Sequence, residues 1–197
     1  MKTYPAEKGL ESVSQGLQVL GGYGFCMDFI LQQYYRDIRI ISIYEGTTGI
    51  QSLDLLGRKV GLHDGKVLEM LGKEVQTTIM EAMKHESLQP YAQQLGASLG
   101  QVQEVLGALM RYAKKGDFER YLADATLFMD FFGTLIIAWQ WLKIGVAVQG
   151  KTGAFYEGKL HTMKFFFKYE LSRTKGLSKV IMDELDLTVD MELDYLD

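Results

Sequence analysis

Glu45 is the residue of this sequence whose setting suits general-base chemistry. It lies between the aromatic Tyr44 and Gly46, just before a helix that Thr47 or Thr48 can cap. A carboxylate shielded by an aromatic ring and an apolar substrate becomes a stronger base, because desolvation disfavours its charged form. A plainer interpretation is a helix-end charge that the helix dipole stabilises. These residues alone leave both interpretations open.

Two short runs of small residues could receive a phosphate-bearing ligand. Thr47, Thr48 and Gly49 open a predicted helix, where free backbone amides form a general anion site. The run Gln18–Gly24 (QVLGGYG) ends another helix at a glycine-rich turn, where backbone can closely approach a neighbouring group. Glycines also end most helices that stop sharply, and the spacing is neither a dinucleotide fingerprint nor a P-loop. By itself, this turn is therefore weak support for a ligand site.

Taken together, these runs resemble the C-terminal domain of the acyl-CoA dehydrogenases. The family pattern is a Q-x-x-G-G-x-G turn, then Y-R-D, then I-Y-E-G-T and I-Q. This sequence has the same elements in the same order, namely QVLGGYG at 18–24, YRD at 35–37, IYEGT at 43–47 and IQ at 50–51. The resemblance covers residues 1–60. From residue 61 onward the chain is similar in plan to the extra helical domain of the longer branch, which includes the 3-methylmercaptopropionyl-CoA dehydrogenases.

The resemblance implies a flavin enzyme that oxidises the carbon–carbon bond next to a thioester. It assigns Glu45 as the base that removes the α proton, and Gly46 as the backbone position that lies against the substrate. It also implies a set of residues that contact FAD: Gln18, Val19, Leu20, Gly21, Gly22, Thr47, Thr48 and Gly49. At Gly49 the shorter enzymes often have a polar or acidic residue, so this chain departs from the family there.

The resemblance further implies an acyl-CoA substrate, an electron-transfer flavoprotein as partner, and a homo-oligomer. The family's N-terminal helical domain, central β domain and early C-terminal helices supply most of the flavin and acyl-CoA pockets, and the sequence has no counterpart of them. We therefore expect the isolated chain to lack FAD and activity. Two alternatives stay open: a non-catalytic flavoprotein relative of the alkylation-response type, and a helical oligomerisation module.

The elements that position these residues are predicted to be all α-helical. Only Pro5 and Pro90 could interrupt helices, and strand-like alternation is nearly absent. Helices are expected at 7–20, 28–37 and 47–60, with an extended connection at 38–46. A turn-rich break at 61–65 (GLHDG) sets a domain boundary, so residues 1–60 end the catalytic domain. Four amphipathic segments follow, the last two at 117–148 and 154–182, and they predict an antiparallel four-helix bundle within residues 61–197.

Composition and charge indicate which kinds of partner, compartment and metal site to expect. The chain has a net charge of −4, and seven acids and no base follow residue 182. No concentrated basic face indicates a nucleic-acid partner. The apolar run 131–148 is interrupted by Gln140 and Lys143, so we expect a buried helix and no membrane span. The single Cys26 and the polar N-terminus favour a reducing, cytoplasmic setting. The three histidines lack a metal-binding spacing, so no metal site is expected.

Overall fold

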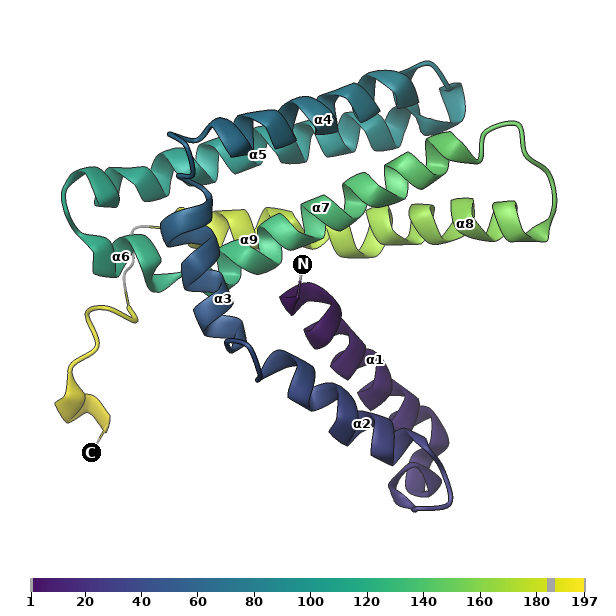
Figure 1. Cartoon of the computed structure of the whole chain (residues 1–197), viewed down its shortest axis with the longest axis horizontal. Coiled ribbons are helices and arrows are strands. Elements are labelled where there is room, and N and C mark those ends of the chain that lie inside the picture. Colours follow the sequence, from purple (N-terminus) through teal and green to yellow (C-terminus); the bar gives the residue numbers. More distant parts are fainter. Residues whose placement is uncertain (1, 184–186, 197) are drawn as a thin grey trace. The chain divides into compact units, whose positions relative to one another are not determined.

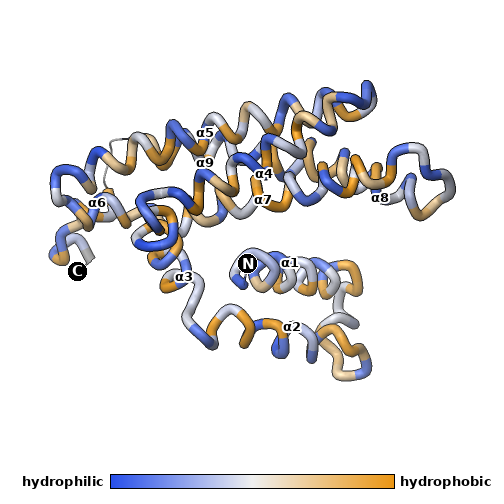
Figure 2. Tube along the Cα trace, turned by 45° about the horizontal axis from the view of Figure 1, so that its top comes forward, coloured by the Kyte–Doolittle hydropathy of each residue, from blue (hydrophilic) through white to orange (hydrophobic). Residues whose placement is uncertain are grey.

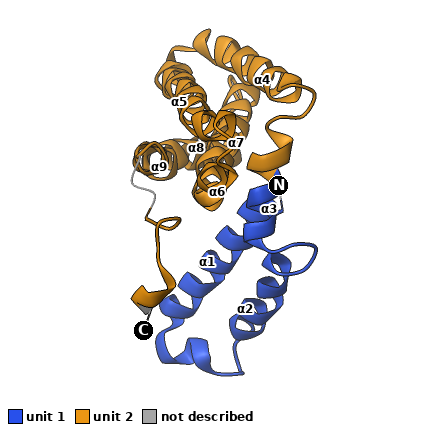
Figure 3. Ribbon diagram, turned by 90° about the vertical axis from the view of Figure 1, so that its left-hand side faces the viewer, with its two compact units in different colours: residues 1–54 blue, residues 55–197 orange. Residues whose placement is uncertain are grey.

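The computed structural model describes residues 2–183 and 187–196, and within them every regular element is helical (Figure 1). The chain divides into two compact units, residues 1–54 and 55–197, which Figure 3 colours separately. We call them the N-terminal unit and the C-terminal unit. The all-α prediction and the helical bundle are confirmed. The predicted domain boundary at residue 61 stays a prediction, six residues from the division between the units.

The N-terminal unit is a helical hairpin followed by a short helix. Its elements are α1 (Thr3–Leu20), the 3-10 helix η1 (Gly21–Phe25), α2 (Leu31–Arg39), the 3-10 helix η2 (Ile40–Ser42) and α3 (Thr48–Asp54). Helices α1 and α2 pack side by side. The turn after α1 needs two of its glycines, because Gly21 has φ 58° and a Cβ on Gly24 would lie 2.5 Å from the carbonyl oxygen of Leu17.

The extended connection predicted at 38–46 is wrong. Helix α2 continues to Arg39, and η2 follows it directly. The β-branched run at 38–43 favoured an extended chain locally, but Ser42 is buried and its hydroxyl donates to the carbonyl oxygen of Arg39. Arg39 in turn donates to the Ser42 hydroxyl at 3.0 Å. These tertiary and local polar contacts outweigh the β propensity.

The C-terminal unit is a bundle of long helices. It begins with the π-helix η3 (Leu55–Lys59), followed by α4 (Lys66–Met83), the 3-10 helix η4 (Glu86–Leu88), α5 (Gln89–Lys114) and the short α6 (Phe118–Ala123). Next come α7 (Ala125–Ala147), α8 (Ala154–Phe165), the π-helix η5 (Phe166–Glu170), the 3-10 helix η6 (Leu171–Arg173), α9 (Thr174–Ile181) and the 3-10 helix η7 (Leu193–Leu196). Figure 2 shows hydrophobic positions recurring along these helices.

Helix α7 forms the centre of the bundle. It packs against α4, α5, α8 and α9, and it carries the fully buried Phe128, Phe131, Leu135 and Leu142. By length and composition α7 is also the one helix among the described residues that could cross a membrane. It packs on four neighbouring helices, and 39% of the residues in its most apolar window are buried within the bundle.

The bundle differs from the expectation in its helix ends. The segment predicted at 117–148 is two helices, because α6 ends at Ala123 and Asp124 separates it from α7. Asp117 caps α6 by accepting a hydrogen bond from the backbone of Arg120 at 3.1 Å. The segment predicted at 154–182 is helical throughout but passes through a π-helix and a 3-10 helix. Of the acidic tail, Glu184, Asp186 and Asp197 lie outside the described residues.

Candidate functional site

Glu45 has an unusual backbone conformation. Its φ is 55° and that of the following Gly46 is 93°, so two consecutive residues adopt positive φ. A left-handed conformation is rare for a residue with a side chain and costs of order 1 kcal/mol or more. Such strain persists only where surrounding contacts fix it, and it occurs preferentially at functional positions. The contacts of the loop therefore fix the backbone from which the Glu45 side chain projects.

Side chains from two other places fix this loop. The Lys2 ammonium donates hydrogen bonds to the carbonyl oxygens of Tyr44 and Gly46, and it lies 5.3 Å from the centre of the Tyr44 ring. The Gln51 amide, one turn into α3, donates to the carbonyl oxygen of Glu45 at 2.8 Å. All three carbonyl oxygens of the loop are thus bonded within the N-terminal unit, which offsets the strain at Glu45.

The Glu45 carboxylate itself is exposed and has no hydrogen bond or ion pair with another described residue. The shielding expected from Tyr44 is incomplete, since the Tyr44 side chain is 46% exposed and stacks with Lys2. The carboxylate is therefore free to accept a proton from a bound molecule. Within this unit, the apolar surroundings that raise basicity have to come largely from whatever binds against it.

The three small residues that follow Gly46, namely Thr47, Thr48 and Gly49, make different contacts. Thr47 accepts from the backbone N–H of Ile50 at 3.5 Å, as a capping residue does, while Thr48 donates its hydroxyl proton to Glu7. Thr48 is thus used to fasten α3 to α1. A Cβ on Gly49 would meet nothing within 4 Å, so a ligand could lie against this position.

The glycine turn lies at the other end of α1. The backbone N–H of Gly21 donates to Gln18, Val19 is 87% exposed, and Leu20 is half-buried. A Cβ on Gly22 would meet nothing within 4 Å, so no packing within the unit requires glycine there. The open backbone at Gly22, like that at Gly49, fits the close approach of a cofactor. The two predicted clusters are separate, because α1 spans about 1.5 Å per residue over 18 residues.

Sequence reasoning assigned no role to Lys2, Glu7 or Gln51. Lys2 contacts the loop and Glu7 contacts Thr48 only because the fold brings them together, since these pairs are 42 and 41 residues apart in sequence. Gln51 is the exception that the sequence could have indicated, because it lies six residues after Glu45 and at the start of a helix that Thr47 caps.

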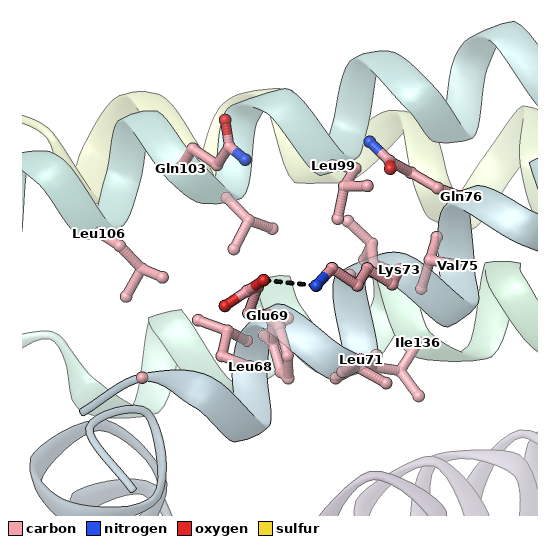
Figure 4. Close-up of a pocket in the computed structure, with 15 residues that line it drawn as sticks. Leu68, Glu69, Leu71, Lys73, Val75, Gln76, Leu99, Gln103, Leu106 and Ile136 are labelled. Atoms are coloured by element: carbon pink, nitrogen blue, oxygen red, sulfur yellow. Dashed lines mark ion pairs between the residues drawn. The ribbon is translucent and has the colours of Figure 1, made fainter. Parts of the chain in front are cut away.

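The C-terminal unit holds a separate cleft. It has a volume of about 420 Å³ and lies between α4, α5 and α7 (Figure 4). Leucine, valine, isoleucine and phenylalanine side chains form most of its lining, and the ion pair between Lys73 and Glu69 lies beside it. That pair lowers the pKa of Glu69, chiefly through the hydrogen bond from Lys73. Across the described residues, no group of three His, Cys, Asp or Glu side chains could hold a metal ion.

Comparison with known proteins assigns both parts of the chain. Residues 1–60 match the family described as "Acyl-CoA dehydrogenase, C-terminal domain", and residues 71–192 match that described as "Acetyl-CoA dehydrogenase C-terminal like". The chain belongs to the acyl-CoA dehydrogenase family. The predicted resemblance is thereby confirmed, and Glu45, Gly46 and the glycine turn all lie in the first of these matches.

Two of the relatives are named acyl-CoA dehydrogenases and are much longer than this chain. The chain is 32% identical to the broad-specificity linear acyl-CoA dehydrogenase FadE5 of Mycobacterium tuberculosis, over 98% of the chain and 34% of the relative. It is 33% identical to the 3-methylmercaptopropionyl-CoA dehydrogenase of Ruegeria pomeroyi, over 94% of the chain and 32% of the relative. A shorter match, 36% identical over 28% of the chain and 15% of the relative, is to the caffeyl-CoA reductase–Etf complex subunit CarC of Acetobacterium woodii. The chain thus spans about a third of the length of its two long relatives.

Proposed function

We propose that this chain supplies the catalytic base of a flavin-dependent acyl-CoA dehydrogenase. The observation that carries the proposal is the conformation of Glu45, which has φ 55° and an exposed carboxylate on a loop whose carbonyl oxygens are bonded by Lys2 and Gln51. An exposed carboxylate on a fixed backbone can accept the α proton of an acyl-CoA thioester that binds beside it. Family membership makes this the leading chemistry for the site.

The neighbours of Glu45 support binding and orientation. Gly46 offers backbone without a side chain, so a thioester can approach the base closely. At Gly49 and Gly22 an added Cβ would meet nothing within 4 Å, and these are the positions where FAD could lie against this chain. FAD, when bound, would supply the hydride acceptor. Lys2 and Gln51 act as positioning residues because they bond the backbone carbonyl oxygens of the loop.

The substrate and partner also belong to this proposal. Relatives named for linear acyl-CoA and 3-methylmercaptopropionyl-CoA favour an acyl-CoA thioester as substrate. The relative named as a subunit of an Etf complex favours an electron-transfer flavoprotein as electron acceptor. By itself the chain is proposed to lack bound flavin and turnover, since it spans about a third of its long relatives.

The test replaces the base in a full-length enzyme that contains this chain. Glu45→Gln keeps the size of the side chain but cannot accept the α proton, so flavin reduction by acyl-CoA should slow by about 10²- to 10⁴-fold. Glu45→Asp keeps a carboxylate one methylene further back and should retain partial activity. Glu11→Gln, on the exposed surface of α1, is the matched control and should leave the rate unchanged.

Flavin content and folding should be the same in all three variants. Flavin reduction at the parental rate in Glu45→Gln would overturn the assignment of the base. It would favour the alternative of a non-catalytic flavoprotein of the same family.

A further inference from the structure

We propose that the acidic tail of one copy of this chain docks on the basic, aromatic face of α8 to α9 of a second copy. The proposal rests on two segments of the same chain that match each other in charge, in apolar content and in length. It is independent of the chemistry at Glu45.

The docking face is a continuous exposed strip of the C-terminal unit. Residues 151–182 contain seven Lys and Arg and two acids, a net charge of +5. One of the two acids, Glu170, is paired with Arg173 at 3.2 Å. Figure 1 shows α8 and α9 running on in one direction, so these charges are distributed along one rod. The net charge of the whole chain is −4, so the total charge does not indicate this local basic strip.

Two parallel rows of exposed residues make up the strip. At helical spacings of four, four, three and four lie Lys164, Lys168, Ser172, Lys175 and Lys179, and all five are exposed. The adjacent row, one position on, consists of Phe165, Tyr169, Arg173, Gly176 and Val180, which are also exposed. Phe165, Tyr169 and Val180 are 53%, 50% and 53% exposed. We call these ten residues the two-row face.

Aromatic rings and lysines alternate on this face in direct contact. The rings of Phe165 and Tyr169 have centroids 4.7 Å apart, and the Lys168 ammonium lies 5.0 Å from the centre of the Tyr169 ring. Apolar surface of this kind, left in water beside a row of cations, favours a partner that is both acidic and apolar.

The tail has that character. Residues 185–195 alternate strictly between apolar residues at odd positions and polar residues at even positions, and residues 183–197 carry seven acids and no base. In an extended chain this alternation places acids along one edge and apolar side chains along the other. Leu187, Leu193 and Tyr195 are 73%, 82% and 68% exposed, so the apolar edge is not buried against the tail's own copy. Asp190 does form an ion pair with Arg120 of the same chain.

The length of the tail is similar to the length of the two-row face. In the structure residues 193–196 form the 3-10 helix η7, so docking in an extended form requires η7 to unwind. The eight residue steps 187–195 then cover about 26 Å at 3.3 Å per residue. The fifteen steps from Lys164 to Lys179 include the π-helix η5 and the 3-10 helix η6, and at the α-helical rise of 1.5 Å per residue they cover on the order of 22 Å. A tail that lies between the two rows would set its acidic edge beside the row that contains Lys164 and Lys168. Its apolar edge would lie beside the row that contains Phe165 and Tyr169. Two such contacts, exchanged between two copies, close a symmetric dimer.

The experiment measures self-association of the full 197-residue chain and of two charge-reversed variants. One variant reverses the face (Lys164→Glu with Lys168→Glu). The other reverses the tail (Glu192→Lys with Asp194→Lys), which leaves the Asp190 ion pair intact. The matched control, Lys114→Glu with Lys115→Glu, reverses two exposed lysines at the end of α5. Sedimentation equilibrium gives the dissociation constants, and circular dichroism checks that helical content is unchanged.

The parental chain and the control should dimerise, and the dimer should weaken as salt is raised from about 0.05 M to 0.5 M. Each reversed variant alone should have a dissociation constant raised by about tenfold or more. An equimolar mixture of the two reversed variants should recover association, because an acidic face then meets a basic tail. Docking of the tail within one chain cannot produce that recovery.

Several results would overturn the proposal. These are a monomeric parental chain, a dimer that both reversals leave unchanged, or a mixture that fails to associate. Vesicles containing phosphatidylglycerol provide a further arm. Binding to them that requires Lys164 and Lys168, without self-association, would assign the two-row face to an anionic membrane surface instead.

Discussion

The two units of this chain keep their shape by different means. In the N-terminal unit the buried residues among those described are Ala6, Gly24, Ser42 and Ser52, all of them small. In the C-terminal unit the fully buried side chains include Phe128, Phe131, Phe167 and several leucines. The unit with a large core holds no candidate base, while the unit that carries Glu45 has almost no core.

Polar contacts, and not a hydrophobic core, fix the candidate site in the N-terminal unit. The N-terminal unit exposes Phe25 (94%), Met27 (88%) and Val19 (87%), which is apolar surface that water does not favour. Its loop at Glu45 is fixed instead by polar contacts from Lys2 and Gln51. Local polar bonding can fix the backbone of one loop, but hydrophobic burial is what stabilises a unit as a whole.

Separating the units should produce the largest difference. Residues 55–197 are expected to give a cooperative helical melt followed by circular dichroism, because their core is complete. Residues 1–54 are expected to melt without cooperativity, because too little apolar surface is buried to offset the chain entropy. Cooperative melting of residues 1–54 alone would contradict the conclusion that this unit lacks a hydrophobic core of its own.

A large-to-small change in the bundle core should come next. Phe131→Ala removes a fully buried ring from α7, and it should lower the free energy of unfolding by about 3–5 kcal/mol. Phe25→Ala, at an exposed position of the N-terminal unit, is the matched change and should cost under about 0.5 kcal/mol. Urea denaturation of the whole chain measures both, and similar losses would contradict the contrast between the units.

A buried hydrogen bond near the start of the bundle should have a smaller effect. The Tyr121 hydroxyl donates to the carbonyl oxygen of Leu56 at 2.8 Å, and Tyr121→Phe should cost about 1–2 kcal/mol. Burial also raises the pKa of Tyr121 above 10.0. Its contribution is therefore fully present below pH 10 and is lost as the pH rises through the raised value. In the Phe variant this alkaline part of the stability loss should vanish, which thermal melts between pH 8 and 11 would test.

Loss of the Gln51 hydrogen bond should change amide exchange only near the Glu45 loop. Gln51→Leu removes the hydrogen bond to the Glu45 carbonyl oxygen, so amide exchange across 44–51 should accelerate by about three- to tenfold. The bundle amides should not change. Gln33→Leu, on the exposed surface of α2, is the control, and equal acceleration in both variants would remove Gln51 from the positioning role.

The smallest effect is expected at the cap of α6. The pKa of Asp117 is lowered, first by the hydrogen bond from the backbone of Arg120 and then by that from its side chain. Because the folded pKa is depressed, the contribution is present above the ordinary value and is lost as the pH falls through the lowered one. Asp117→Asn should reduce the melting temperature slightly at pH 7 and by less at pH 3. An unchanged difference at the two pH values would contradict the charged cap.

By itself, the sequence determined the helical class, the family and the candidate base. Periodicity of three and four residues along 68–113 requires helices that bury one side. The run IYEGT at 43–47 indicated Glu45 through its resemblance to the acyl-CoA dehydrogenases, since the residue types alone left its role open. These are local signals, so a single chain read in order is enough to detect them. The π-helix at 166–170 was not predictable in this way, since its residues have ordinary helical propensity.

The tertiary structure alone decided what fixes Glu45 and which apolar residues form a core. Lys2 reaches the loop across 42 residues of sequence, and the positive φ of Glu45 follows from contacts of this kind. Val19 and Phe131 are both apolar residues of helical segments, yet the first is exposed and the second is fully buried. Hydropathy sets what a residue gains from burial, but only the packing of distant elements decides whether a partner surface is present to bury it.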